Sequence, residues 1–145
     1  MAEPSYMDCN VSLGYPAAGV YRPCGTAEEL VAELDWAGVD GALVHHALMR
    51  EQSPVVGNRA LTEAIAGFER LAATWAILPP QTGELGEPDA LFAAMAAANV
   101  RALWAFPDDH RYILGRATFG AFLDEVSARR IPLFLPRDAG GPRPP

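Results

Sequence analysis

Five short apolar runs recur about every thirty residues along this chain, and a helix-like stretch separates each run from the next. Each run ends in polar residues or prolines, which is typical of a strand that emerges at the surface. Strands that are buried on both faces of a parallel sheet read as continuous apolar segments. The spacing therefore predicts repeated strand–helix units. The five predicted strands span residues 6–13, 39–46, 71–79, 100–107 and 131–136.

Capping signals predict helices between these runs. Thr26 can accept a hydrogen bond from a backbone N–H at a helix start while Glu29 reaches back three residues, a capping box. Gly38 ends that helix, because glycine readily adopts the left-handed conformation of a C-terminal cap. Ser53 followed by Pro54 predicts the start of the next helix. Two further helices are predicted over residues 89–98 and 119–130.

The alternation of strands and helices allows two α/β architectures. Five strands could complete an open, doubly wound sheet, whereas a closed (β/α)8 TIM barrel needs eight. The turn after the first strand lacks the G-x-G-x-x-G pattern, and the chain has no lysine for a Walker-type loop, so nucleotide binding has no support. In 145 residues we expect one domain over residues 1–136 and a proline- and glycine-rich tail over residues 137–145.

Charge and hydropathy argue against several classes of partner. A formal net charge of −7 argues against nucleic acid, because phosphate binding needs clustered positive charge. No stretch of 18 apolar residues suggests a membrane span and no secretory leader is visible, so we expect a cytoplasmic protein. Cys9 and Cys24 predict free thiols, with Cys9 a small core residue. Core or helix-packing positions are also expected for Trp36, Trp75 and Trp104.

Polar side chains near the strand ends are the candidates for chemistry, since folds of this type gather reactive groups at that rim. On the first strand, Asp8, Asn10 and Ser12 are alternate residues that share one face. His45 and His46 end the second strand. Adjacent residues of a strand point in opposite directions, so at most one of these histidines faces the interior or the rim.

The fourth and fifth strands deliver further polar residues. Asp108, Asp109 and His110 follow the fourth strand, and Arg137 and Asp138 follow the fifth. With one histidine of the second strand, the two carboxylates and His110 are chemically adequate metal donors, and one histidine could act as a general acid–base. The alternative is structural: the histidines satisfy loop backbone groups and the aspartates cap a turn.

Four segments of the chain match a known family in order and in local sequence. They are M-D-C-N-V-S-L-G at 7–14, G-V-D-G-A-L-V at 38–44, G-N-R-A-L at 57–61 before R-L at 70–71, and I-P-L-F-L at 131–135. Together they resemble the first half of the amidohydrolase-related family. The resemblance implies a TIM-barrel type of fold, here only its first five βα units. It also implies hydrolases or decarboxylases, mostly metal-dependent, that act on small carboxylic acids, amides or lactones.

The resemblance further implies where a metal would bind. The family's first strand normally ends in Asp-x-His-x-His, and Asn10 and Ser12 stand in place of the two metal-binding histidines. The histidine that normally ends the fifth strand is replaced by Pro136. Zinc is therefore the cofactor that the family implies, but its usual ligands are absent and we predict no metal-binding residues. Some relatives hydrolyse lactones without a divalent metal.

We expect an amidohydrolase-like hydrolase with a divergent, metal-poor site for a small polar or carboxylate-bearing molecule. The expected substrate-binding residues are Asn10, Ser12 and Arg137, and the expected catalytic residues are His46, His110 and Asp108. The histidines would move protons and the aspartate would orient a histidine. The alternative is a catalytically inactive barrel descendant that serves as a binding or protein-interaction module, which the loss of three ligand positions favours.

Five units leave the last strand with an unpaired edge. We therefore expect either a fragment of a longer gene product or a chain that self-associates as a homo-oligomer. The fragment is the favoured expectation, because the sequence stops in Gly-Pro-Arg-Pro-Pro where a rim loop would continue.

Overall fold

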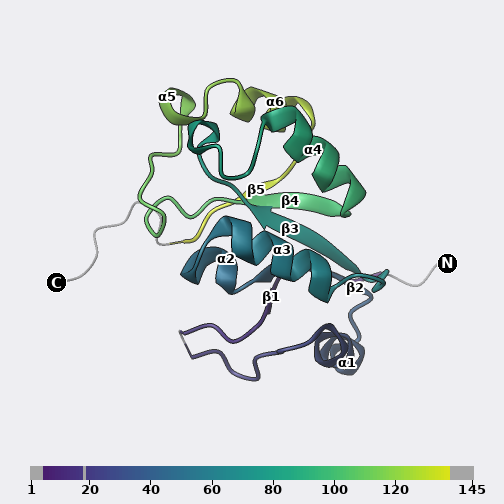
Figure 1. Ribbon diagram of the computed structural model, residues 1–145. Helices are drawn as coiled ribbons and strands as arrows, with labels where there is room; N and C mark the ends of the chain where they lie inside the picture. Colours follow the sequence, from purple (N-terminus) through teal and green to yellow (C-terminus); the bar gives the residue numbers. More distant parts are fainter. Residues whose placement is uncertain (1–4, 18, 138–145) are drawn as a thin grey trace.

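The computed structural model of this chain describes residues 5–17 and 19–137. A five-stranded parallel sheet runs through its centre, with the strands in sequence order (Figure 1). A doubly wound sheet would reverse its strand order, so this order identifies the other architecture, a curled half-barrel. The strands are β1 Met7–Leu13, β2 Gly41–His46, β3 Leu71–Ala76, β4 Val100–Trp104 and β5 Leu133–Phe134.

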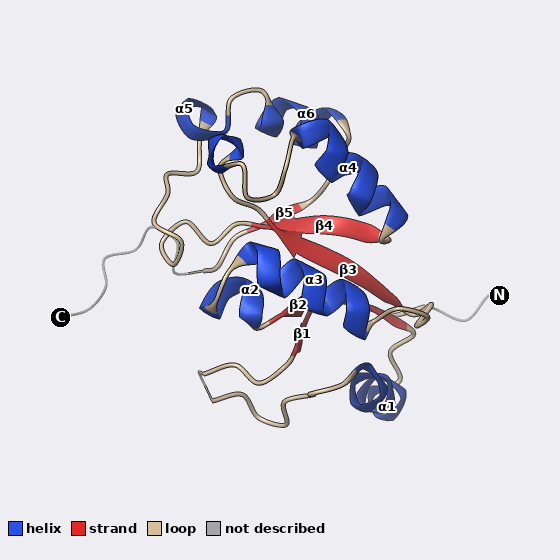
Figure 2. Cartoon of the chain, viewed as in Figure 1, coloured by secondary structure: helices blue, strands red, loops and turns tan. Residues whose placement is uncertain are grey.

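Helices connect the strands and cover one face of the sheet (Figure 2). α3 contacts β2 and β3, and α4 contacts β4. Among the described residues, no helix has the length and apolarity needed to cross a bilayer. The helices are α1 Ala27–Ala37, α2 Leu48–Glu51, α3 Pro54–Ala64, α4 Pro88–Ala97, α5 Arg116–Phe119 and α6 Phe122–Ala128, with a 3-10 turn, η1, at Pro80–Thr82.

The predicted helix caps of α1 and α3 are confirmed. The Thr26 hydroxyl accepts a hydrogen bond from the Glu29 N–H at 3.2 Å, and the Glu29 carboxylate accepts one from the Thr26 N–H at 3.4 Å. Gly38 ends α1 in the left-handed conformation, with φ 69°. The Ser53 hydroxyl accepts a hydrogen bond from the Val56 N–H at 3.2 Å, and Pro54 is the first residue of α3.

A glycine and an asparagine seat α3 against its neighbours. A Cβ on Gly57 would overlap the backbone nitrogen of Met49 in α2, so only glycine allows this close approach. Asn58 is buried, and its amide group donates to the Ala76 carbonyl at 2.9 Å and accepts from the Ala76 N–H at 2.8 Å. The pair therefore fixes α3 over the carboxyl end of β3.

Two elements are shorter than the sequence predicts. Of the helix expected over residues 119–130, only α6 at 122–128 forms, because Gly120 with φ 54° separates it from Phe119 at the end of α5. The fifth strand contains only two residues, flanked by Pro132 and Pro136, which cannot donate a backbone hydrogen bond to a neighbouring strand. The short helix α2, directly after β2, was not predicted at all.

Two residues expected in the core lie at the surface. Cys9 is exposed because β1 is an edge strand, with β2 as its one strand partner among the described residues. Trp36 is 79% exposed, and the guanidinium of Arg22 lies 5.5 Å from the centroid of its ring. The other two tryptophans follow the expectation: Trp104 is buried, and Trp75 packs between the sheet and α3.

Candidate functional site

Strand register divides the sheet residues between two faces. The Trp75 indole donates a hydrogen bond to the Thr62 hydroxyl of α3 at 3.1 Å, so Trp75 lies on the helix-covered face. Its neighbours in the chain point the other way, because successive strand residues alternate. We call that second side the concave face. Following the register across the sheet, it carries Ser12, His45, Thr74, Ala76, Ala102, Trp104 and Phe134.

His45 and His46 point in opposite directions, as predicted. His45 pairs with Ser12 in the register, which places both on the concave face near the carboxyl ends of β1 and β2. His46 pairs with Leu13, a fully buried residue, and lies on the helix side. The histidine that faces the candidate site is therefore His45, whereas sequence reasoning favoured His46.

His45 is a neutral imidazole with a free nitrogen. Burial lowers its pKa from 6.5 to about 4, the adjacent His46 adds to that effect, and the Val11 backbone opposes it. Its Nδ1 is buried and has no hydrogen-bond partner among the described residues. The ring packs against Trp104, with 5.3 Å between ring centroids. An imidazole that is neutral at neutral pH keeps a lone pair that can accept a proton, although its low pKa makes it a weak base.

His46 has a structural contact instead. Its Nδ1 accepts a hydrogen bond from the Leu48 N–H at 3.2 Å, at the start of α2. Burial lowers its pKa. A Cβ on Gly14 would lie 2.9 Å from its Cε1, so the turn after β1 packs closely on the ring. Its role as a catalytic residue stays a prediction.

Asp109 and His110 tie the loop after β4 to α2. The Asp109 carboxylate accepts a hydrogen bond from the Arg50 Nε at 2.9 Å, and the His110 Nε2 lies 3.3 Å from the Arg50 carbonyl oxygen. The His110 Nδ1 is buried without a hydrogen-bond partner among the described residues. Asp108 is exposed and makes no side-chain hydrogen bond within that part of the chain. The structure thus brings His110 to the rim without a contact to Asp108.

The three predicted substrate-binding residues occupy different positions. Ser12 is partly buried beside His45 on the concave face. Asn10 is exposed on β1, and its backbone N–H donates to the Asp8 carboxylate at 2.9 Å. Arg137 is exposed after β5, and Asp138 lies outside the described residues. Of these three, only Ser12 is a register neighbour of a histidine.

A row of aromatic rings connects His45 to His110, and sequence reasoning missed this row. Trp104 stacks on Phe106 with 5.5 Å between centroids and a 2° interplanar angle, and the edge-on His110 ring lies 5.7 Å from Phe106. The Tyr112 hydroxyl accepts from the Phe106 N–H at 3.0 Å and donates to the Ile77 carbonyl at 3.2 Å. The aromatic residues at alternate positions 104 and 106 were the signal for an apolar site wall.

The described residues do not fit a zinc ion. No group of three or more His, Cys, Asp or Glu side chains converges anywhere within residues 5–17 and 19–137. A structural or catalytic zinc site needs at least three such donors. We therefore derive no chemical step through a metal.

Comparisons with known proteins bear on the fold. No family model matches the chain, and a search of curated proteins finds no match. A solved structure, the probable 2-pyrone-4,6-dicarboxylic acid hydrolase from Acinetobacter baumannii with citric acid bound, matches with a TM-score of 0.63 at 13% identity. The match covers 91% of this chain and 49% of that one, so the chain spans about half of the hydrolase. The likeness shows the fold alone: a curled half-barrel that corresponds to about half of that chain.

Proposed function

We propose that this chain provides the first half of an amidohydrolase-like hydrolase barrel that acts on a small polar or carboxylate-bearing molecule, such as a lactone or an amide. The observation that carries the proposal is the neutral His45 imidazole beside Ser12 on the concave face, with its Nδ1 unpartnered among the described residues. The structural likeness to a probable 2-pyrone-4,6-dicarboxylic acid hydrolase supports a carboxylate-bearing substrate.

The residues suggest a hydrolysis that uses a general base. The neutral imidazole of His45 accepts a proton from water, and the resulting hydroxide attacks the carbonyl carbon of the substrate. The bond from that carbon to the leaving oxygen or nitrogen breaks, and the imidazolium returns the proton to the leaving group. Ser12 donates a hydrogen bond to the carbonyl oxygen. Asn10 is the second proposed donor to the substrate.

The remaining predicted residues belong to the rim. Arg137 would bind a substrate carboxylate, for which its planar guanidinium is suited. His110 and Asp108 would serve a second proton transfer, with His110 already fixed by the Arg50 carbonyl. His46 remains the competing candidate for the base.

Hydrolysis assays on lactone and amide panels, with and without chelator, test this function. We expect turnover of at least one carboxylate-bearing lactone or amide, at the same rate in both conditions, because no step runs through a metal. An absence of turnover across both panels would contradict the proposed hydrolase. Loss of turnover with chelator would contradict the metal-free route.

A binding module is the second candidate, and the donor set of the described residues favours it, since the usual metal ligands of the family are missing. The matching hydrolase was crystallised with citric acid, so citrate is a suitable probe for a carboxylate site. Saturable citrate binding by calorimetry, together with no turnover on either panel, would support the module over the enzyme.

A further inference from the structure

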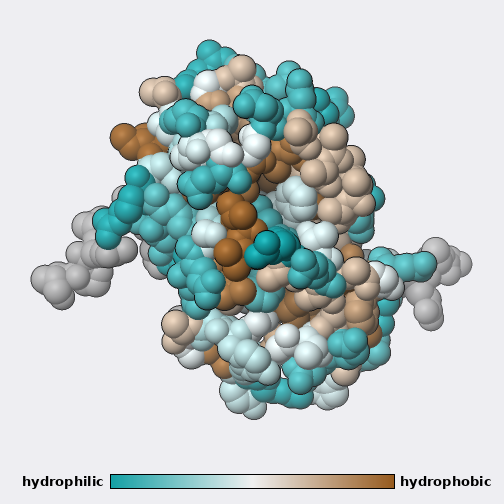
Figure 3. All heavy atoms as spheres, viewed as in Figure 1, coloured by the Kyte–Doolittle hydropathy of each residue, from teal (hydrophilic) through white to brown (hydrophobic). Residues whose placement is uncertain are grey.

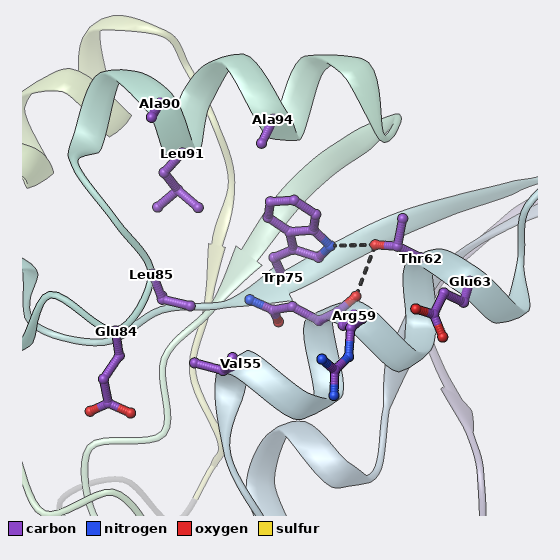
Figure 4. A pocket seen from close by; sticks show the side chains of 11 residues that line it. Val55, Arg59, Thr62, Glu63, Trp75, Glu84, Leu85, Ala90, Leu91 and Ala94 are labelled. Atoms are coloured by element: carbon purple, nitrogen blue, oxygen red, sulfur yellow. Dashed lines mark hydrogen bonds between the residues drawn. The ribbon is translucent and has the colours of Figure 1, made fainter.

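A groove lies on the helix-covered side of the sheet, away from the concave face. It runs between α3 and α4, with Trp75 of β3 among its lining residues (Figure 4). Its volume is about 510 Å³, within the range of small-molecule sites. Figure 3 shows hydrophobic surface along a hollow on this side of the molecule, with strongly hydrophilic atoms beside it.

Small side chains on α4 keep the groove open. Ala90 and Ala94 line it one helical turn apart, where larger residues would fill the space between two packed helices. Leu85 and Leu91 complete the wall on the α4 side, and Val55 contributes from α3. The groove is therefore apolar and is left open by small side chains rather than by a missing element.

The polar atoms inside the groove already have partners. The Trp75 indole N–H donates to the Thr62 hydroxyl at 3.1 Å, and that hydroxyl donates to the Asn58 carbonyl at 2.8 Å. The Asn58 amide is bonded at both ends to the Ala76 backbone. A ligand would lose affinity by burying unmatched polar groups here, so its buried part must be apolar. The indole offers a flat surface for stacking.

The rim carries charge that the protein does not neutralise locally. Arg59, Glu63 and Glu84 line the groove, and their side chains make no hydrogen bond or ion pair with the described residues. Figure 4 shows Glu63 and Glu84 on opposite sides of Trp75. Two carboxylates against one guanidinium leave a net negative rim on a chain whose formal charge is −7. This charge favours a cation over an anion.

We propose that the groove between α3 and α4 binds an amphiphilic organic cation: a flat apolar body that stacks on Trp75, with an ammonium group held by the net negative charge of the rim that Glu63 and Glu84 flank. This site is independent of the proposed hydrolase, because it lies on the opposite face of the sheet. Its loss would leave the concave face unchanged.

Calorimetry with two probes of the same size tests the proposal: 1-naphthylmethylammonium and 1-naphthoate. We expect the cation to bind the full chain with a dissociation constant below about 1 mM and at least threefold more tightly than the anion. Equal or tighter binding of naphthoate would overturn the proposed charge preference. No binding of either probe would overturn the site.

Variants of α4 locate the binding. Ala94→Trp should fill the groove and weaken cation binding by at least about tenfold. Ala93→Trp is the matched control, because Ala93 is an exposed alanine of the same helix that does not line the groove. Thermal unfolding of both variants confirms that each is folded. Unchanged binding by a folded Ala94→Trp variant would contradict the location.

Variants of the rim test the charge. The double change Glu63→Gln and Glu84→Gln should weaken cation binding by roughly threefold to tenfold, since exposed ionic contacts are individually modest. Arg59→Gln should strengthen it, because the like charge is removed. An effect of opposite sign in either variant would contradict the proposed role of the carboxylates.

Discussion

His45 is the residue whose surroundings say most about the site. Its imidazole has a pKa of about 4 in the folded chain, chiefly because burial disfavours the charged form. Two neighbours on the concave face, Ser12 in the register and Trp104 against its ring, define how a substrate would meet it. The imidazole is therefore neutral under ordinary conditions and able to accept a proton.

The depressed pKa of His45 predicts a loss of stability in acid. Between pH 6.5 and about 4 the unfolded chain binds a proton that the folded chain does not, so stability falls as the pH falls through this window. The full effect is roughly 3 kcal/mol. Urea unfolding of wild type and of His45→Asn, at about pH 7 and about pH 4, isolates it. The wild type should lose roughly 3 kcal/mol more than the variant, and equal losses would contradict the buried neutral imidazole.

The sequence identified His45 and His46 as candidate site residues, but it did not determine which of the two faces the site. Strand alternation required His45 and His46 to point in opposite directions, and the structure confirms this. Which one faced the site depended on the register against Ser12, a contact 33 residues distant in sequence. The exposure of Cys9 was missed for a similar reason, since a strand segment does not reveal that it lies at a sheet edge.

At the scale of elements, the packing of α3 explains a local sequence feature. The Gly57-Asn58 pair, which belongs to one of the segments that carry the family resemblance, brings α3 against α2 and fixes it to β3. Helix starts at Thr26 and Ser53 were predicted because capping is a local interaction. The break at Gly120 and the short α2 were not, because tertiary contacts decide whether a weak helical segment continues.

Gly57→Ala should separate α2 from α3. The added Cβ would overlap the Met49 backbone, which cannot move as a flexible side chain can. We expect a loss of about 1–3 kcal/mol in the free energy of unfolding, measured by chemical denaturation. Gly19→Ala is the control, because a Cβ there meets no atom within 4 Å. Equal stabilities of the two variants would contradict the close contact between the helices.

At the scale of the whole molecule, the described residues form a curled half-barrel. The five strand–helix units and the parallel direction of their strands were predictable from the sequence, since buried parallel strands and their helices have distinct apolar patterns. Closure was not, because it depends on strands that the described residues do not supply. Apart from an isolated bridge between Leu13 and Cys24, the outer edge of β1 has no strand partner among the described residues.

The open edges predict self-association of the isolated chain. Met7 on edge strand β1 is 58% exposed, and unpaired strand edges readily pair with another chain. Sedimentation velocity should show dimers or larger species at micromolar concentrations. Met7→Lys, which places a charge on the edge, should shift the distribution toward monomer. A wild-type chain that is monomeric and unfolds cooperatively would contradict this prediction.

The central claim, that His45 on the concave face is the base of a hydrolase, is tested most directly by comparing two neighbouring variants. His45→Asn and His46→Asn make the same change on opposite faces of β2, and asparagine at 46 keeps an acceptor for the Leu48 N–H. On the best lactone or amide substrate, His45→Asn should lower kcat by at least about 100-fold. His46→Asn, corrected for its folded fraction, should stay within about threefold of wild type. An equal loss in both variants, or a larger loss for His46→Asn, would contradict the account.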